Sequence, residues 1–166
     1  MNQAELEFKP LTLVDARKQM LKEAMDGIET ECPCCTRYVK LYKRKLNSIM
    51  AFYLVCLYKN RKPGEPGELV DIRETLAWKS GTQRGDYAYL KHWGLIEDLP
   101  ADRKVERSSS MWRITPKGIA FVMFRDTTVP SHVHILCGEV VGFSETQITI
   151  DKALGEKFSY PELMNS

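Results

Sequence analysis

The sequence lacks the residue patterns of the common enzyme classes. It has only three histidines, and none stands with a serine, cysteine or carboxylate in a spacing typical of nucleophilic catalysis. Neither a P-loop nor a G-x-G-x-x-G motif is present. We therefore expect a protein that is not an enzyme.

Long hydrophobic runs are also missing. The longest apolar run, residues 50–58, is far too short to cross a bilayer, and no Arg-flanked apolar leader follows Met1. With 166 residues, 43% hydrophobic and 28% charged, the chain has the size and composition of a globular protein that buries a core without disulfides. These features predict a cytoplasmic protein without a membrane partner.

The sequence does not indicate a disulfide framework either, because the number of cysteines is odd and three of them lie close together in the sequence. The five are Cys32, Cys34, Cys35, Cys56 and Cys137. Three cysteines within four positions favour reduced thiols or a metal site over secreted disulfides.

Cys32 and Cys35 have the C-x-x-C spacing of a zinc knuckle, in which a tight turn directs two thiolates at one ion, and Pro33 favours such a turn. A tetrahedral Zn²⁺ site needs two further ligands. The weaker candidates are Cys34, His132, His134 and Cys137. Three readings remain open: fold-back of the tail completes the site, a second chain supplies the missing pair, or the thiols are ordinary.

The net charge of +2 hides an uneven distribution. Residues 31–125 contain 18 basic and 10 acidic side chains, whereas residues 1–30 and 126–166 are both net acidic. A polyanionic partner explains a basic middle segment, and so does a solvated Lys/Arg surface.

Helical periodicity is clear in the first part of the chain. Thr12 is a suitable N-cap for a helix that begins at Leu13 and runs up to Gly27, which is a suitable stop. The expected apolar face consists of Val14, Met20, Leu21, Ala24 and Met25. This helix packs either on its own domain or on a second copy in a homodimer.

A second helix is predicted for residues 46–60, with Cys56 in its apolar face. The basic residues Lys43, Arg44 and Lys45 precede it, and we place them at its start. Cations at a helix start oppose the local dipole, which suggests that they serve contact with phosphate.

Residues 70–123 predict two more helices and a strand-loop-strand. A helix at 70–78, a turn at 79–81 and a helix from Thr82 to Gly94 are followed by a strand from Leu95, a charged loop, a strand at 112–115 and a helix from Pro116, capped by Thr115.

Two motifs within this segment resemble a known family. Leu90, Gly94, Leu95 and Ile96 are placed as in the L-x-x-x-G-L-I ending of recognition helices in winged-helix regulators of the MarR and PadR type, and WRITPKG at 112–118 is similar to their Y-x-L-T-x-K-G. The likeness covers residues 43–125 and implies a winged helix-turn-helix. The chain also resembles small bacteriophage and prophage proteins that combine a CPxC knuckle with such a core, a likeness that implies no activity.

In the docking mode of this fold, the third helix enters the major groove and the wing contacts the backbone. The expected DNA-binding residues are Lys43, Arg44, Lys45, Arg84, Tyr89, Lys91, Arg103, Lys104, Arg107 and Arg113. Because few of them reach base edges, we expect a transcription regulator that binds double-stranded DNA mainly through phosphate and wing contacts. The alternative is a phage-type adaptor or inhibitor that uses the winged helix to contact a host protein.

The tail alternates apolar and polar residues from Thr127, which predicts two or three short antiparallel strands, and then offers short helical turns interrupted by Gly155 and Pro161. The predicted fold is α+β. It has an N-terminal helix and CPCC turn (1–42), a winged-helix domain (43–125) and a β-hairpin and short-helix extension (126–166).

Overall fold

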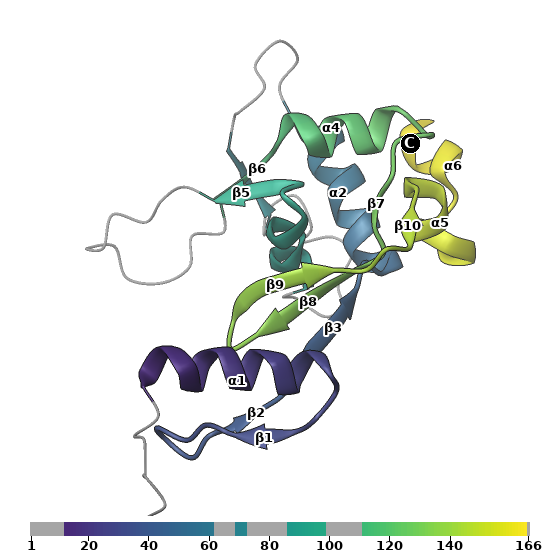
Figure 1. Cartoon of the computed structure of the whole chain (residues 1–166). Helices are drawn as coiled ribbons and strands as arrows, with labels where there is room; N and C mark the ends of the chain where they lie inside the picture. Colours follow the sequence, from purple (N-terminus) through teal and green to yellow (C-terminus); the bar gives the residue numbers. More distant parts are fainter. Residues whose placement is uncertain (1–11, 62–68, 73–85, 99–110, 166) are drawn as a thin grey trace, which may run out of the picture. The chain divides into compact units, whose positions relative to one another are not determined.

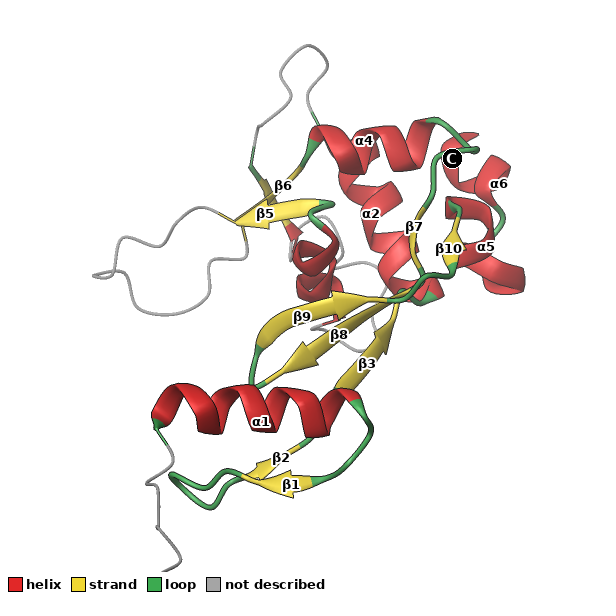
Figure 2. Ribbon diagram, in the orientation of Figure 1, coloured by secondary structure: helices red, strands yellow, loops and turns green. Residues whose placement is uncertain are grey.

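The computed structural model describes residues 12–61, 69–72, 86–98 and 111–165, which form a mixed α and β structure, as the α+β prediction requires (Figures 1 and 2). The chain divides into two compact units. The first comprises residues 1–43 and 134–141, and the second comprises residues 44–133 and 142–166. No helix in the described part of the chain is long and apolar enough to cross a membrane.

The first unit contains helix α1 (Leu13–Met25) and the two-stranded hairpin of β1 (Thr30–Glu31) and β2 (Tyr38–Val39). Thr12 caps α1 as predicted, because its Oγ1 accepts a hydrogen bond from the N–H of Asp15, and Gly27 leaves the helix at a φ of 80°. Side chains of α1, the hairpin and the tail pack in one small cluster: Met20, Ala24, Cys32, Val39, Leu41, Leu136 and Val141.

The predicted apolar face of α1 is wrong in part. Val14, Leu21 and Met25 are exposed, whereas Ala16 and Ala24 are buried. The buried row runs along positions 16, 20 and 24 at a spacing of four residues. Small alanine side chains allow a close approach of the helix to its neighbours, and the larger apolar residues lie on the side that faces solvent.

Helix α2 (Ser48–Asn60) is the centre of the second unit. It contacts η1 (Asp86–Trp93), β6 (Met111–Ile114), α4 (Pro116–Met123), α5 (Ile150–Leu154) and α6 (Tyr160–Asn165). Because neighbours surround it, eight of its 13 residues are buried and they occupy more than one face. The expected single apolar face therefore underestimates its burial, and Cys56 is only half-buried.

A three-stranded sheet in the second unit has the order β4-β6-β5 and is antiparallel throughout. Strand β5 (Ile96–Asp98) pairs with β6 from Ile96 opposite Ile114 to Asp98 opposite Trp112. Strand β4 is Val70–Asp71, so the helix predicted for 70–78 begins too early. Ile72 is helical, while the remainder of that helix and the predicted turn at 79–81 lie outside the described residues.

The two motifs that carry the family resemblance meet at one joint. The Thr115 hydroxyl donates to the carbonyl of Gly94 over 2.6 Å and accepts from the N–H of Gly118 over 3.0 Å, so it caps α4 as predicted. Lys117 Nζ donates to the carbonyl of Trp93 over 2.8 Å. A β-carbon at Gly118 would lie 2.2 Å from the Leu95 carbonyl oxygen, so only glycine permits this close approach.

The tail forms short strands and helical turns, as predicted. Strands β7 (Val129–Pro130) and β10 (Gln147–Ile148) pair with each other, and β8 (His132–Leu136) lies between β3 (Tyr42–Lys45) and β9 (Glu139–Phe143). Helix α5 continues into the 3₁₀ turn η2 (Gly155–Lys157), and α6 follows. Arg125 makes two 2.8 Å hydrogen bonds to Asp151 and so links the end of α4 to α5.

Candidate functional site

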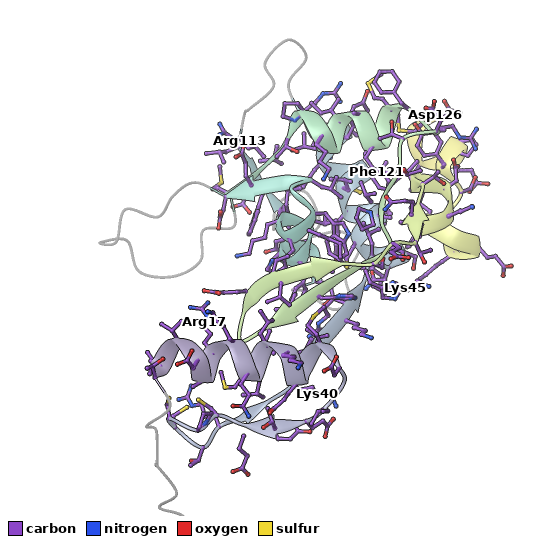
Figure 3. All side chains as sticks on the ribbon, in the orientation of Figure 1. Arg17, Lys40, Lys45, Arg113, Phe121 and Asp126 are labelled. Carbon is purple, nitrogen blue, oxygen red and sulfur yellow. The ribbon has the colours of Figure 1, made fainter. Side chains whose placement is uncertain are left out.

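The basic residues that precede α2 lie in a strand. Lys43, Arg44 and Lys45 belong to β3, all three are exposed, and α2 begins at Ser48 with Asn47 as its N-cap. The predicted position at a helix start is therefore wrong, and the argument from the helix dipole does not apply. Cross-strand pairing with β8, which lies far along the chain, sets the strand conformation. Figure 3 shows Lys45 on this strand.

Element η1 is a 3₁₀ helix, whereas the sequence predicts an α-helix from Thr82; residues 82–85 lie outside the described part. Its aromatic residues and histidine are weak helix formers. Residues three apart align along a 3₁₀ helix. One row, Tyr87, Leu90 and Trp93, is directed inward, with Leu90 and Trp93 buried. The row of Asp86, Tyr89 and His92 lies on another side.

Arg44 of β3 contacts the second row. Its Cζ lies 4.7 Å from the centre of the Tyr89 ring, and its Nη2 donates to Tyr89 Oη over 3.3 Å. The His92 ring centre lies 5.9 Å from that of Tyr89. The aromatic face and the hydroxyl of Tyr89 therefore set the position of this guanidinium, an arrangement suited to contact with an anion. The fold brings together two residues, Arg44 and Tyr89, that were predicted separately as DNA-binding.

Asn47 fixes the adjoining end of this row. Its Oδ1 accepts from the N–H of Met50 over 2.9 Å, and its Nδ2 donates to Asp86 Oδ2 over 3.4 Å. Neither Asn47 nor His92 is among the predicted site residues. The preference of asparagine for N-caps is a sequence signal for Asn47. His92 follows Tyr89 by three residues, a spacing that makes two side chains neighbours on an α-helix as well as on a 3₁₀ helix, so this spacing is the sequence signal for His92.

The pKa of His92 is lowered from its ordinary value of 6.5, first by burial and then by the charge of Lys91. As the pH falls below 6.5, His92 becomes protonated in the unfolded chain but stays neutral in the folded chain. The free energy of unfolding therefore decreases with falling pH until the pKa of His92 in the folded chain is reached. We expect the wild type to lose more thermal stability between about pH 7.5 and 5.5 than a His92→Gln variant. Equal losses in calorimetric scans would contradict this assignment.

The other predicted cations that the structure describes, Lys91 and Arg113, differ in their surroundings. Lys91 is the exposed residue of η1, whereas Arg113 Nε lies 2.7 Å from Glu97 Oε1, its cross-strand partner. Figure 3 shows Arg113 on β6. The predicted residues Arg84, Arg103, Lys104 and Arg107 lie outside the described residues. Among the described residues, Arg44 contacts Tyr89 and Tyr89 contacts His92, while Lys45 and Lys91 are exposed cations on the same two elements.

The CPCC turn connects β1 to β2. Backbone N–H groups of Cys34 and Cys35, and then the Cys35 thiol, interact with the Cys32 sulfur and lower the pKa of the Cys32 thiol, while burial opposes this. Burial and the neighbouring Cys32 raise the pKa of the Cys34 thiol.

Apart from Cys34, the weaker metal candidates lie on β8 or in the turn that follows it. His132 and His134 are half-buried on alternate residues of β8, and Cys137 is exposed in the turn after that strand. Ser131 Oγ lies 2.9 Å from the His132 ring nitrogen Nδ1. Within the described ranges, no three His, Cys, Asp or Glu side chains form a group placed to hold a metal ion.

Comparisons of this chain with protein-family models, with curated proteins and with solved structures found no match.

Proposed function

We propose that residues 43–125 form a winged helix-turn-helix that binds double-stranded DNA, most simply as a transcription regulator. The order of the described elements supports this: α2, β4, the helix start at Ile72, η1, β5, β6 and α4. In this proposal η1 is the end of the recognition helix and residues 99–110 form the wing.

The contact between Arg44 and Tyr89 carries the DNA-binding part of the proposal. It adds an ordered guanidinium from β3 to the side of η1, and Lys45 and Lys91 are exposed on the same two elements. These groups suit phosphate oxygens, because arginine is the preferred partner for bidentate phosphate contacts and lysine acts as a point charge.

The same geometry limits base reading. In η1 only Lys91 is exposed, and the other seven residues are half-buried or buried. A helix covered in this way offers little to the major groove. The proposed binding is therefore mainly electrostatic and weakly selective for sequence, since phosphate contacts position a protein and base contacts give specificity.

Titration of a labelled duplex at two salt concentrations tests the proposal. Three phosphate contacts, from Arg44, Lys45 and Lys91, give a salt slope of about −2.7, so affinity should fall about 40-fold between roughly 50 and 200 mM salt. Wing contacts would steepen this dependence. Absence of duplex binding by the folded protein at the lower salt would refute the proposal.

The covered face of η1 favours a second candidate, in which the winged helix contacts a host protein as an adaptor or inhibitor. A protein-contact role requires no salt-dependent DNA affinity. Folded protein that fails to bind any duplex at low salt supports this candidate over the first.

A further inference from the structure

The turn from Cys32 to Arg37 is closed tightly by backbone hydrogen bonds. The N–H of Cys32 donates to the Arg37 carbonyl over 2.8 Å, and the N–H of Thr36 donates to the Cys32 carbonyl over 2.8 Å. Thr36 has a φ of 57°, in the left-handed region. These bonds place Cys32 and Cys35 on one tight turn of the backbone, the arrangement that the C-x-x-C spacing of a zinc knuckle requires.

Of the two cysteines of the C-x-x-C pair, Cys32 is half-buried and Cys35 is exposed to solvent. Cys32 packs against the cluster that contains Ala24, Val39 and Met20, so its sulfur is fixed relative to α1 and the hairpin. The turn therefore presents half of a thiolate site to solvent.

The chain does not supply the other half within the described structure. All five cysteines and all three histidines lie in the described ranges, and no three such ligands converge there. Structural zinc is almost always bound by four ligands, with thiolate and imidazole preferred. Among the described residues, one copy therefore offers the two sulfur ligands of the C-x-x-C turn and no third or fourth ligand grouped with them.

We propose that two copies of this chain complete one zinc site, each contributing Cys32 and Cys35, so that the metal bridges a homodimer. The four thiols release their protons to solvent when they bind the ion. The resulting centre, four thiolates and one Zn²⁺, carries two net negative charges. The backbone N–H groups of Cys34 and Cys35 and the exposed Arg37 beside the turn stabilise that charge.

The first unit leaves several large apolar side chains exposed. Tyr38, which follows the turn, is 58% exposed, and Leu13 and Val14 of α1 are 75% and 61% exposed. These side chains are available for contact with a second copy. A second copy bridged through the metal is the occupant that the incomplete ligand set requires.

Zinc content and molecular mass, measured on the same sample, test the proposal. We expect full-length protein, purified with reductant and without chelator, to contain one zinc ion for every two chains and to have the mass of a dimer in light scattering. Removal of zinc with a chelator should give monomers, and added zinc should restore dimers. One zinc per monomer, protein without zinc, or a dimer that chelator leaves intact would each overturn the proposal.

Cysteine variants test the assigned ligands. Cys35→Ser should abolish zinc binding and dimer formation, and because Cys35 is exposed the variant should stay folded by circular dichroism. Cys34→Ser and Cys137→Ser are matched controls at other exposed cysteines and should keep both properties. Zinc retained by Cys35→Ser, or lost only from a control, would overturn the assignment. The test is independent of DNA binding, so its outcome and that of the proposed function are separable.

Discussion

Gly118→Ala is expected to destabilise the second unit by about 3 kcal/mol, the upper part of the range for overpacked sites. An added β-carbon would lie 2.2 Å from the Leu95 carbonyl oxygen and 2.7 Å from Ile114 Cγ1. The backbone cannot simply move away, because the same oxygen accepts a hydrogen bond from the N–H of Thr115 over 3.0 Å. Urea unfolding followed by tryptophan fluorescence measures the effect, since Trp93 and Trp112 are both buried in this unit.

Whether Gly118→Ala lowers or raises the free energy of unfolding tests the close approach at this position. In an open helix, replacing glycine with alanine stabilises by up to about 1 kcal/mol through helix propensity. A stable Gly118→Ala variant would therefore contradict the close approach of α4 to Leu95. Gly94→Ala is the control, because Gly94 has a φ of 68° but no neighbour within 4 Å of an added β-carbon. It should cost only the strain of a left-handed residue, about 1–2 kcal/mol.

Removing the charges of Arg44 and Lys45 on β3 is expected to cause the largest loss of DNA affinity among the described residues. Each lost phosphate contact reduces the salt slope by about 0.9, and its energy corresponds to about a tenfold loss of affinity. The double variant Arg44→Ala, Lys45→Ala should thus bind duplex about 100-fold more weakly at low salt, with a slope smaller by about 1.8. The same titration measures both quantities.

Two further variants separate charge from position. Arg44→Lys keeps the charge but loses the planar contact with Tyr89, so it should keep the salt slope and lose part of the affinity. Lys152→Ala removes an exposed cation from α5 and should change neither quantity. If Lys152→Ala weakens binding as much as the β3 variant, the effect reflects net charge and the site is not at β3.

Features set by local chemistry are predictable from this sequence. Thr12 and Thr115 cap their helices, Gly27 and Gly94 adopt positive φ, and the strand before Thr115 is present. Each depends on a few neighbouring residues whose preferences agree. The two family-like motifs also contact each other, because the Thr115 hydroxyl donates a hydrogen bond to the Gly94 carbonyl. This contact explains why both motifs are present in the same fold. Those motifs therefore bear on the fold more directly than on the function.

Features set by distant partners are not predictable in the same way. The sequence YKRK has no strand pattern of its own, and its pairing with β8 decides its conformation. The buried side of α1 likewise depends on the hairpin and on Leu136. In the candidate site, the contact between Arg44 and Tyr89 joins residues 45 positions apart, so it depends on the tertiary fold and not on local sequence.

The division of the chain has a consequence for folding kinetics. The first unit needs residues 134–141, and its Arg17–Glu139 ion pair joins positions 122 residues apart. Contacts of such long range require closure of a large loop and slow folding. During synthesis, α1 and the CPCC turn emerge from the ribosome first but must wait for the tail before their small core is complete. The amino-terminal unit therefore cannot be completed until residues 134–141 have been synthesised.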